Sequence, residues 1–206
     1  MISVLLVENS PLVRLGVKTL LAETDDIDLV GEAETPEEGF RQFVEFAPDV
    51  TILGLRFPDS CSIDDLEKYL RESSDAKILM LADHAGDAEI KRALDRGARG
   101  YICKNIAPHA LLDAIRRVAR GGKYIPDDIA DILDEHRGSE SLTPAEENVL
   151  KMLISGSTNK EIAAHLGVSE NTIKTQIQSI FGKLGVDDRT SAATAAIRRG
   201  LVRIDI

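Results

Sequence analysis

The charged and polar residues that could do chemistry in the first half of the chain stand directly after short apolar segments. The positions that follow these segments are Glu8, Gly54, Ala82 and Lys104. Glu8 and Lys104 can form an ion pair, whereas glycine and alanine offer no functional group. The sequence has no nucleophile paired with a base, no cluster of metal ligands and no glycine loop that cradles phosphate, so we expect no enzyme.

A second group of polar residues repeats at helical spacing between positions 170 and 184. Its members are Asn171, Lys174, Thr175, Gln178 and Lys183. Amide and lysine side chains can pair with base edges in the major groove of DNA, whereas hydroxyls, cations and helix N-termini bind phosphates. The spacing is equally typical of the solvated face of an amphipathic helix, so both interpretations remain open on this pattern.

The elements that position the first group alternate between two periods. The apolar segments are Val4–Val7, Leu29–Gly31, Val50–Leu53, Ile78–Leu81 and Gly100–Cys103, and the amphipathic stretches cover 11–22, 36–46, 63–72, 87–96 and 108–120. Continuous apolar runs separated by helices predict parallel strands buried on both faces and joined by right-handed crossovers. The fold class is therefore a doubly wound, flavodoxin-like α/β domain of five strands, whose functional site lies beyond the carboxyl ends of the strands.

The second group belongs to a region that we expect to be entirely helical. The expected helix starts are the capping boxes Thr143–Glu146 and Thr158–Glu161 and the cap Ser169, and the expected ends include Gly167, Gly185 and Gly200. A last helix is predicted from Thr190 to Arg199. Four short helices with a glycine turn between the second and third predict a helix-turn-helix domain.

Three segments follow from these patterns. Residues 1–122 form the α/β domain, which ends at Gly121-Gly122, and residues 141–206 form the all-α helix-turn-helix domain. Residues 123–140 are the linker, with a possible short helix over 126–135 and a polar stretch over 136–141.

Charge and composition narrow the class of protein. The formal net charge of −10 lies wholly in residues 1–138, because residues 139–206 contain eight basic and eight acidic residues. A neutral domain can still direct a few cations at phosphates. Cys61 and Cys103 have no ligand at metal spacing, which indicates reduced thiols, no metal site and a cytoplasmic protein. We expect no membrane span and no signal peptide, since apolar runs of about 18 residues and a basic N-terminal region are missing.

Close to uninterrupted motifs link residues 141–200 to a known family. They are Leu142-Thr143-Pro144, Asn159–Ala163, Val168–Lys174, Lys183–Val186 and Arg189-Thr190. This region resembles the LuxR-type DNA-binding domain. The resemblance implies that Lys174, Thr175 and Gln178 face the groove. It implies phosphate contacts for Asn159, Lys160, Ser169, Thr172 and Lys183. Ala145 and Gln176 depart from residues that are frequent in the family.

The first 122 residues resemble the receiver domain of response regulators of the same class. The matching segments are Val4–Val7, Pro11–Arg14, Pro48–Val50, Gly97–Tyr101, Lys104 and Ala119–Gly122. Such receivers accept a phosphoryl group on an aspartate at the end of the third strand, beside a divalent metal that an acidic pair helps to hold. Here the acidic pair is Glu8-Asn9, Gly54 stands at the acceptor position, and Ala82 replaces the sensing hydroxyl. The resemblance therefore implies a receiver that has lost its phospho-switch.

Two retained residues and one substitute need an interpretation. Lys104 is expected to neutralise Glu8 or to cap a strand-end carbonyl, and Tyr101 is expected to be a packing or interface aromatic. Asp59, or Glu8 itself, is the alternative phosphoryl acceptor, but in-line transfer would need a rebuilt geometry.

Two hypotheses of function follow. The first is a sequence-specific transcription regulator that binds double-stranded DNA at inverted half-sites as a homodimer and is controlled independently of phosphorylation. Its DNA-binding domains would pair through the last helix, where Ala192, Ala193, Ala195 and Ala196 permit close approach. The second is an interaction protein that sequesters another regulator or a kinase through its receiver. Neither hypothesis calls for a cofactor or a metal, and a conventional response regulator would need a substitute acceptor.

Overall fold

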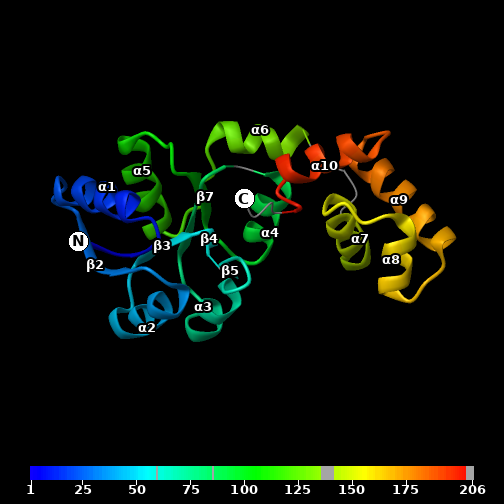
Figure 1. Ribbon diagram of the computed structural model, residues 1–206. Helices are drawn as coiled ribbons and strands as arrows, with labels where there is room; N and C mark the ends of the chain where they lie inside the picture. The colour runs from blue at the N-terminus through cyan, green and yellow to red at the C-terminus, as the bar shows by residue number, and fades with distance from the viewer. Residues whose placement is uncertain (59, 85, 136–141, 203–206) are drawn as a thin grey trace. The chain divides into compact units, whose positions relative to one another are not determined.

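The computed structural model describes residues 1–58, 60–84, 86–135 and 142–202 (Figure 1). The chain divides into two compact units, one formed mainly by the first 131 residues and the other mainly by the residues from 132 onward. Asp59, the expected polar linker 136–141 and the last four residues lie outside the described residues. Within the described ranges, no helix is long and apolar enough to cross a membrane.

The N-terminal unit is built on a parallel five-stranded sheet. Its strands are β1 (Ile2–Val7), β2 (Ile27–Ala33), β3 (Val50–Gly54), β6 (Ile78–Ala82) and β7 (Gly100–Cys103), in the order β2-β1-β3-β6-β7. Each strand contains one of the apolar segments, which confirms the doubly wound α/β prediction. Both β3 and β6 are buried along their whole length, because helices cover both faces of the sheet. The strand order reverses between β1 and β3, so their carboxyl ends border the crevice where such folds place a site.

Five helices flank this sheet close to the predicted positions. They are α1 (Pro11–Ala22), α2 (Pro36–Phe46), α3 (Leu66–Glu72), α4 (Asp87–Asp95) and α5 (Pro108–Ala119). Proline occupies the first turn of α1, α2 and α5, where its missing N–H would be unpaired in any case. Residues of α1 and α5 pack with β1, β3 and β6 in one apolar cluster, whereas Phe43 of α2 lies against Tyr69 of α3, with ring centroids 4.9 Å apart.

A small hairpin follows β3 and was not expected from the sequence. It consists of β4 (Arg56–Phe57) and β5 (Ser60–Cys61), which are antiparallel. The chain then returns to the end of β3, where the N–H of Ser62 donates to the carbonyl of Leu55 at 3.0 Å and its hydroxyl donates to the carbonyl of Gly54. Residues 62–65 form turns, in which the N–H groups of Asp64 and Asp65 donate to the carbonyls of Cys61 and Ser62, so α3 begins at Leu66 and not at the predicted position 63.

The helical part of the chain matches the predicted cap signals. Its helices are α6 (Asp127–Glu135), α7 (Pro144–Ile154), α8 (Asn159–Leu166), α9 (Glu170–Leu184) and α10 (Arg189–Arg198). Both predicted capping boxes form, and the hydroxyl of Ser169 accepts from the N–H of Thr172 at 3.0 Å. Gly167 and Gly185 end α8 and α9 in the left-handed conformation, which glycine adopts without strain. α6 lies within the segment 123–140, in which the sequence allowed a short helix over 126–135.

The core of this unit comes from the inward faces of α7 to α10. Its fully buried members include Val149 and Leu150 of α7, Ile162 of α8, Ile173 and Ile180 of α9, and Ala196 of α10. Ile173 and Ile180 of α9 therefore face inward, which leaves the opposite side of this helix exposed.

Candidate functional site

The strand-end pocket of the N-terminal unit contains the expected ion pair. Glu8 follows β1 and its side chain is fully buried. Its Oε1 accepts a bond from the ammonium of Lys104 at 3.1 Å and another from the N–H of Ser10 at 2.9 Å. Lys104 also contacts Asp83 at 3.1 Å. Desolvation acts to lower the pKa of Lys104, but the bonds to Asp83 and Glu8 outweigh it and raise this pKa above its ordinary value.

Gly54 borders the same carboxylate. A Cβ added at Gly54 would lie 2.7 Å from Oε2 of Glu8 and 3.1 Å from the carbonyl oxygen of Val7. Oε2 is buried and has no hydrogen-bond partner within the described part of the chain. The Glu8 carboxylate thus occupies the space in which a side chain at position 54 would begin, and the pocket has no room there for a larger residue in this arrangement.

Tyr101 and Ala82 are both buried near the strand ends. Alanine at position 82 has no hydroxyl that could bind a phosphoryl group. The Tyr101 side chain is fully buried, and its hydroxyl donates to the carbonyl of His84 at 3.2 Å. Burial raises the pKa of this phenol, so it stays protonated as the donor. This placement supports the packing role that the sequence suggested, since a buried ring is not available as an interface aromatic. Ala82 is also buried, and Asn9 is half-buried.

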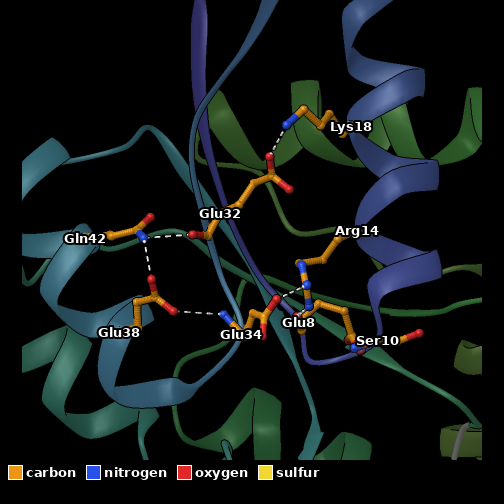
Figure 2. Close-up of polar contacts among 8 residues, drawn as sticks. All are labelled: Glu8, Ser10, Arg14, Lys18, Glu32, Glu34, Glu38 and Gln42. Atoms are coloured by element: carbon orange, nitrogen blue, oxygen red, sulfur yellow. Dashed lines mark hydrogen bonds and ion pairs between the residues drawn. The ribbon is translucent and has the colours of Figure 1, made fainter.

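A network of polar contacts holds the segment after β1, and sequence reasoning missed its central residue, Arg14 (Figure 2). The Arg14 guanidinium donates to the carbonyl of Glu8 at 2.7 Å and forms an ion pair with Glu34. Gln42 donates to the carbonyl of Glu32 at 2.7 Å, and Glu38 accepts from the N–H of Glu34. A basic residue in the helix that follows the Glu8-Asn9 pair was the available signal. These contacts fix the backbone from which Glu8 projects.

Most of the residues predicted for DNA contact are exposed on the helix-turn-helix unit. Lys160 is the second residue of α8, and Ser169 and Thr172 lie at the start of α9. The outward side of α9 carries Lys174, Thr175 and Gln178. Asn159 is half-buried at the first position of α8. Ser169 and Thr172 share a side-chain hydrogen bond of 2.8 Å, and Lys174 lies 3.5 Å from Glu170. The structure thus gathers these side chains at two helix N-termini and one helix face.

Lys183 differs from the other residues predicted for DNA contact because it forms an ion pair with Glu146. Its side chain is 17% exposed, and its ammonium contacts Oε2 of Glu146 at 2.8 Å. Ser179 donates to Oε1 of the same carboxylate at 2.8 Å. Burial acts to raise the pKa of Glu146, but the bonds from Lys183, Thr143 and Ser179 outweigh it and lower the pKa to about 2. Sequence reasoning found Glu146 as a capping residue and missed this second role.

The expected contact between alanines of two copies also needs correction. Ala192, Ala195 and Ala196 of α10 are buried, whereas Ala193 is half-buried, and Ala196 packs in the core of its own unit. The buried alanines are therefore occupied within the chain. The exposed positions of α10 include Thr190, Thr194 and Ile197, which repeat at helical spacing on one face.

Comparison with known protein families now decides the identity of both units. Residues 4–116 match the family model described as "Response regulator receiver domain". Residues 140–196 match the model described as "Bacterial regulatory proteins, luxR family". The chain belongs to the LuxR-type response regulators. It joins a receiver domain to a LuxR-type helix-turn-helix, as the motifs indicated.

Relatives of this LuxR-type response regulator match over nearly its full length. The transcriptional regulatory protein LiaR of Bacillus subtilis is 36% identical, over 98% of this chain and 100% of its own. A nitrate/nitrite response regulator protein homolog of Haemophilus influenzae is 35% identical, over 93% and 94%. Among solved structures, RcsB of Salmonella enterica serovar Typhimurium bound to the promoter P1flhDC shares 25% identity and a TM-score of 0.75, over 97% and 98% of the two chains.

The pocket of this response regulator differs from the one its family uses for phosphorylation. Within the ranges that the structure describes, no group of three or more His, Cys, Asp or Glu residues could hold a metal ion. Asp59, the candidate substitute acceptor, is not among those residues. A divalent metal needs several anionic oxygens, and the pocket residues that resemblance assigns to it offer the Glu8 carboxylate beside a neutral amide. This donor set does not fit the metal of the family.

Proposed function

We propose that this response regulator is a sequence-specific transcription regulator that binds double-stranded DNA in the cytoplasm and works without phosphorylation of its receiver. One observation carries the second part: the Glu8 carboxylate fills the space beside Gly54 and bonds to Lys104. Glycine has no side chain that could accept a phosphoryl group. The Glu8 carboxylate is also the partner of the Lys104 ammonium, so this cation is paired without a phosphoryl group.

The DNA-binding part rests on the helix-turn-helix. Exposed Lys174, Thr175 and Gln178 on α9 are proposed to read base edges in the major groove. Asn159, Lys160, Ser169 and Thr172 are proposed to bind phosphates, aided by the N-termini of α8 and α9. A relative named a transcriptional regulatory protein and a neighbour bound to a promoter support the same function.

We further propose that the regulator binds inverted half-sites as a homodimer. Two-fold symmetric proteins pair with palindromic sites because each recognition helix must enter the groove in the same way. The exposed face of α10, formed by Thr190, Thr194 and Ile197, is the proposed contact between DNA-binding domains. A neighbouring structure described as two RcsB dimers bound to DNA has the same fold.

Two assays test the function. In the first, the full chain is incubated with a small phosphodonor and Mg²⁺, beside a phosphorylatable receiver as positive control, and intact mass is measured. We expect no phosphorylated species, and uptake near one phosphoryl group per chain would refute phosphorylation-independence. In the second, mobility shifts are measured on a DNA duplex selected by this protein from a random pool, over a salt series with competitor DNA. A salt-dependent, competitor-resistant shift supports DNA recognition, and its absence supports a regulator that acts by sequestering a protein partner.

A further inference from the structure

Glu146 is a buried junction between two helices of the helix-turn-helix unit. At the start of α7 its Oε2 accepts from the N–H and the hydroxyl of Thr143, at 2.7 and 2.9 Å. From α9 the Ser179 hydroxyl donates to Oε1 of this carboxylate and the Lys183 ammonium donates to Oε2, both at 2.8 Å. One carboxylate thus caps α7 and binds the C-terminal half of α9. Only 7% of this residue is exposed, so water screens these bonds little.

The two α9 partners lie on one flank of the helix, between the proposed reading face and the buried face. Ser179 and Lys183 are four residues apart and so project from the same side of the helix. Lys183 is nine residues from Lys174, which is about two and a half helical turns, and it therefore points away from the side that carries Lys174. A bond from Glu146 to this flank restrains the rotation and tilt of α9, and it reaches the helix beside Thr175, which stands four residues before Ser179.

We propose that Glu146 is a positioning residue for DNA recognition, which sets how α9 presents Lys174, Thr175 and Gln178 to the groove. The same bond gives Lys183 a positioning role and takes it out of the set of phosphate contacts. This inference rests on the proposed DNA-binding function. A recognition helix must be held within a fraction of an ångström for paired hydrogen bonds to base edges to form together, so a loosened contact on its flank lowers affinity and selectivity.

The chain contains a matched control for this role. Thr158 and Glu161 form a second capping box of the same design, with carboxylate bonds of 2.7 and 2.8 Å to the Thr158 N–H and hydroxyl. Glu161 is exposed, and within the described residues its side chain bonds to Thr158 and not to α9. Glu161→Gln therefore changes the charge and weakens a cap as Glu146→Gln does, but it leaves the contacts of Ser179 and Lys183 on α9 unchanged.

The test measures the dissociation constant of folded full-length protein for the selected duplex, over a salt series and well below each melting temperature. The variants are Glu146→Gln, Lys183→Met, their combination, Lys183→Arg and Glu161→Gln. We expect Glu146→Gln and Lys183→Met each to raise Kd about tenfold with an unchanged salt slope. The double variant should be no weaker than the single variants, Lys183→Arg should recover most of the affinity, and Glu161→Gln should stay within about threefold.

Other results overturn the inference in distinct ways. If Kd of the folded variants equals that of the unchanged protein while only the melting temperature falls, Glu146 is a purely structural cap. If Lys183→Met flattens the salt slope by about one, Lys183 contacts a phosphate. Should Glu146→Gln not fold, Ser179→Ala removes a single hydrogen bond and must raise Kd in the same direction, or the inference fails. If the unchanged protein shows no specific shift, the proposed function has failed instead.

Discussion

The buried carboxylate of Glu8 lies 3.1 Å from the ammonium of Lys104. It also borders Gly54, the position at which the receiver family carries a phosphoryl acceptor. A buried charge is tolerated when a partner and hydrogen bonds compensate for the lost hydration. Lys104 and the N–H of Ser10 provide that compensation for one oxygen of Glu8. The pair therefore explains how the pocket remains folded without the aspartate, and it makes the pocket sensitive to the loss of either charge.

Replacing Lys104 should strongly destabilise the receiver. Lys104→Met leaves the Glu8 carboxylate buried without its cation, and breaking such a pair costs about 3–5 kcal/mol. Lys18 is the matched control, because its contact with Glu32 is at the surface and Lys18→Met should change stability by less than about 0.5 kcal/mol. Urea unfolding, followed through the N-terminal unit, measures both. Equal effects of the two substitutions would show that the Glu8–Lys104 pair is not buried in solution.

A methyl group at position 54 should lower the stability of the receiver domain. Gly54→Ala places a Cβ against Oε2 of Glu8 and the backbone of Val7, so we expect a loss of about 1–3 kcal/mol. In a Glu8→Ala background the loss should shrink, because one of the two clashes is removed. Gly16→Ala in α1 has open space around its Cβ and should stabilise by about 0.5–1 kcal/mol. A neutral Gly54→Ala would mean that Glu8 does not occupy this space.

Protonation of Glu146 at low pH should lower the stability of the helix-turn-helix unit. Hydrogen bonds lower the pKa of Glu146 from 4.5 to about 2, so its contribution is complete above pH 4.5 and is lost as the pH falls toward 2. Relative to Glu146→Gln, which does not titrate, the stability advantage of the unchanged protein should shrink by up to about 3 kcal/mol over this range. Chemical denaturation at a series of pH values measures the gap. Glu161→Gln should show a smaller change, because Glu161 is exposed.

The lysines of the proposed DNA face should separate into two kinds. Lys174→Ala should weaken binding by about 1–3 kcal/mol and relax the preference at one base position. Lys160→Ala should weaken binding to all sequences alike and lower the salt slope by about one. Lys151, exposed on α7 and outside the proposed face, serves as the control for a lost positive charge. Selection from a random pool and a salt series distinguish the effects, and an unchanged base preference in Lys174→Ala would move Lys174 to the phosphate contacts.

Local signals in the sequence predicted the regular elements well. Each of the five apolar segments became a strand because parallel strands are buried on both faces and show no polar alternation. Capping boxes at Thr143 and Thr158 marked the starts of α7 and α8, since those bonds join residues three positions apart. The hairpin at Arg56–Cys61 was missed, because strands of two residues are too short to show a period.

The sequence by itself determined the two-part architecture, the strand and helix order, and the absence of an acceptor side chain at position 54. These properties follow from residue type and from contacts within a few positions along the chain. Only the tertiary structure placed the Glu8 carboxylate beside Gly54 and turned Lys183 toward Glu146, which is 37 positions away. Such contacts depend on how the separate elements pack, and packing decides which charges are buried and which remain free to meet DNA.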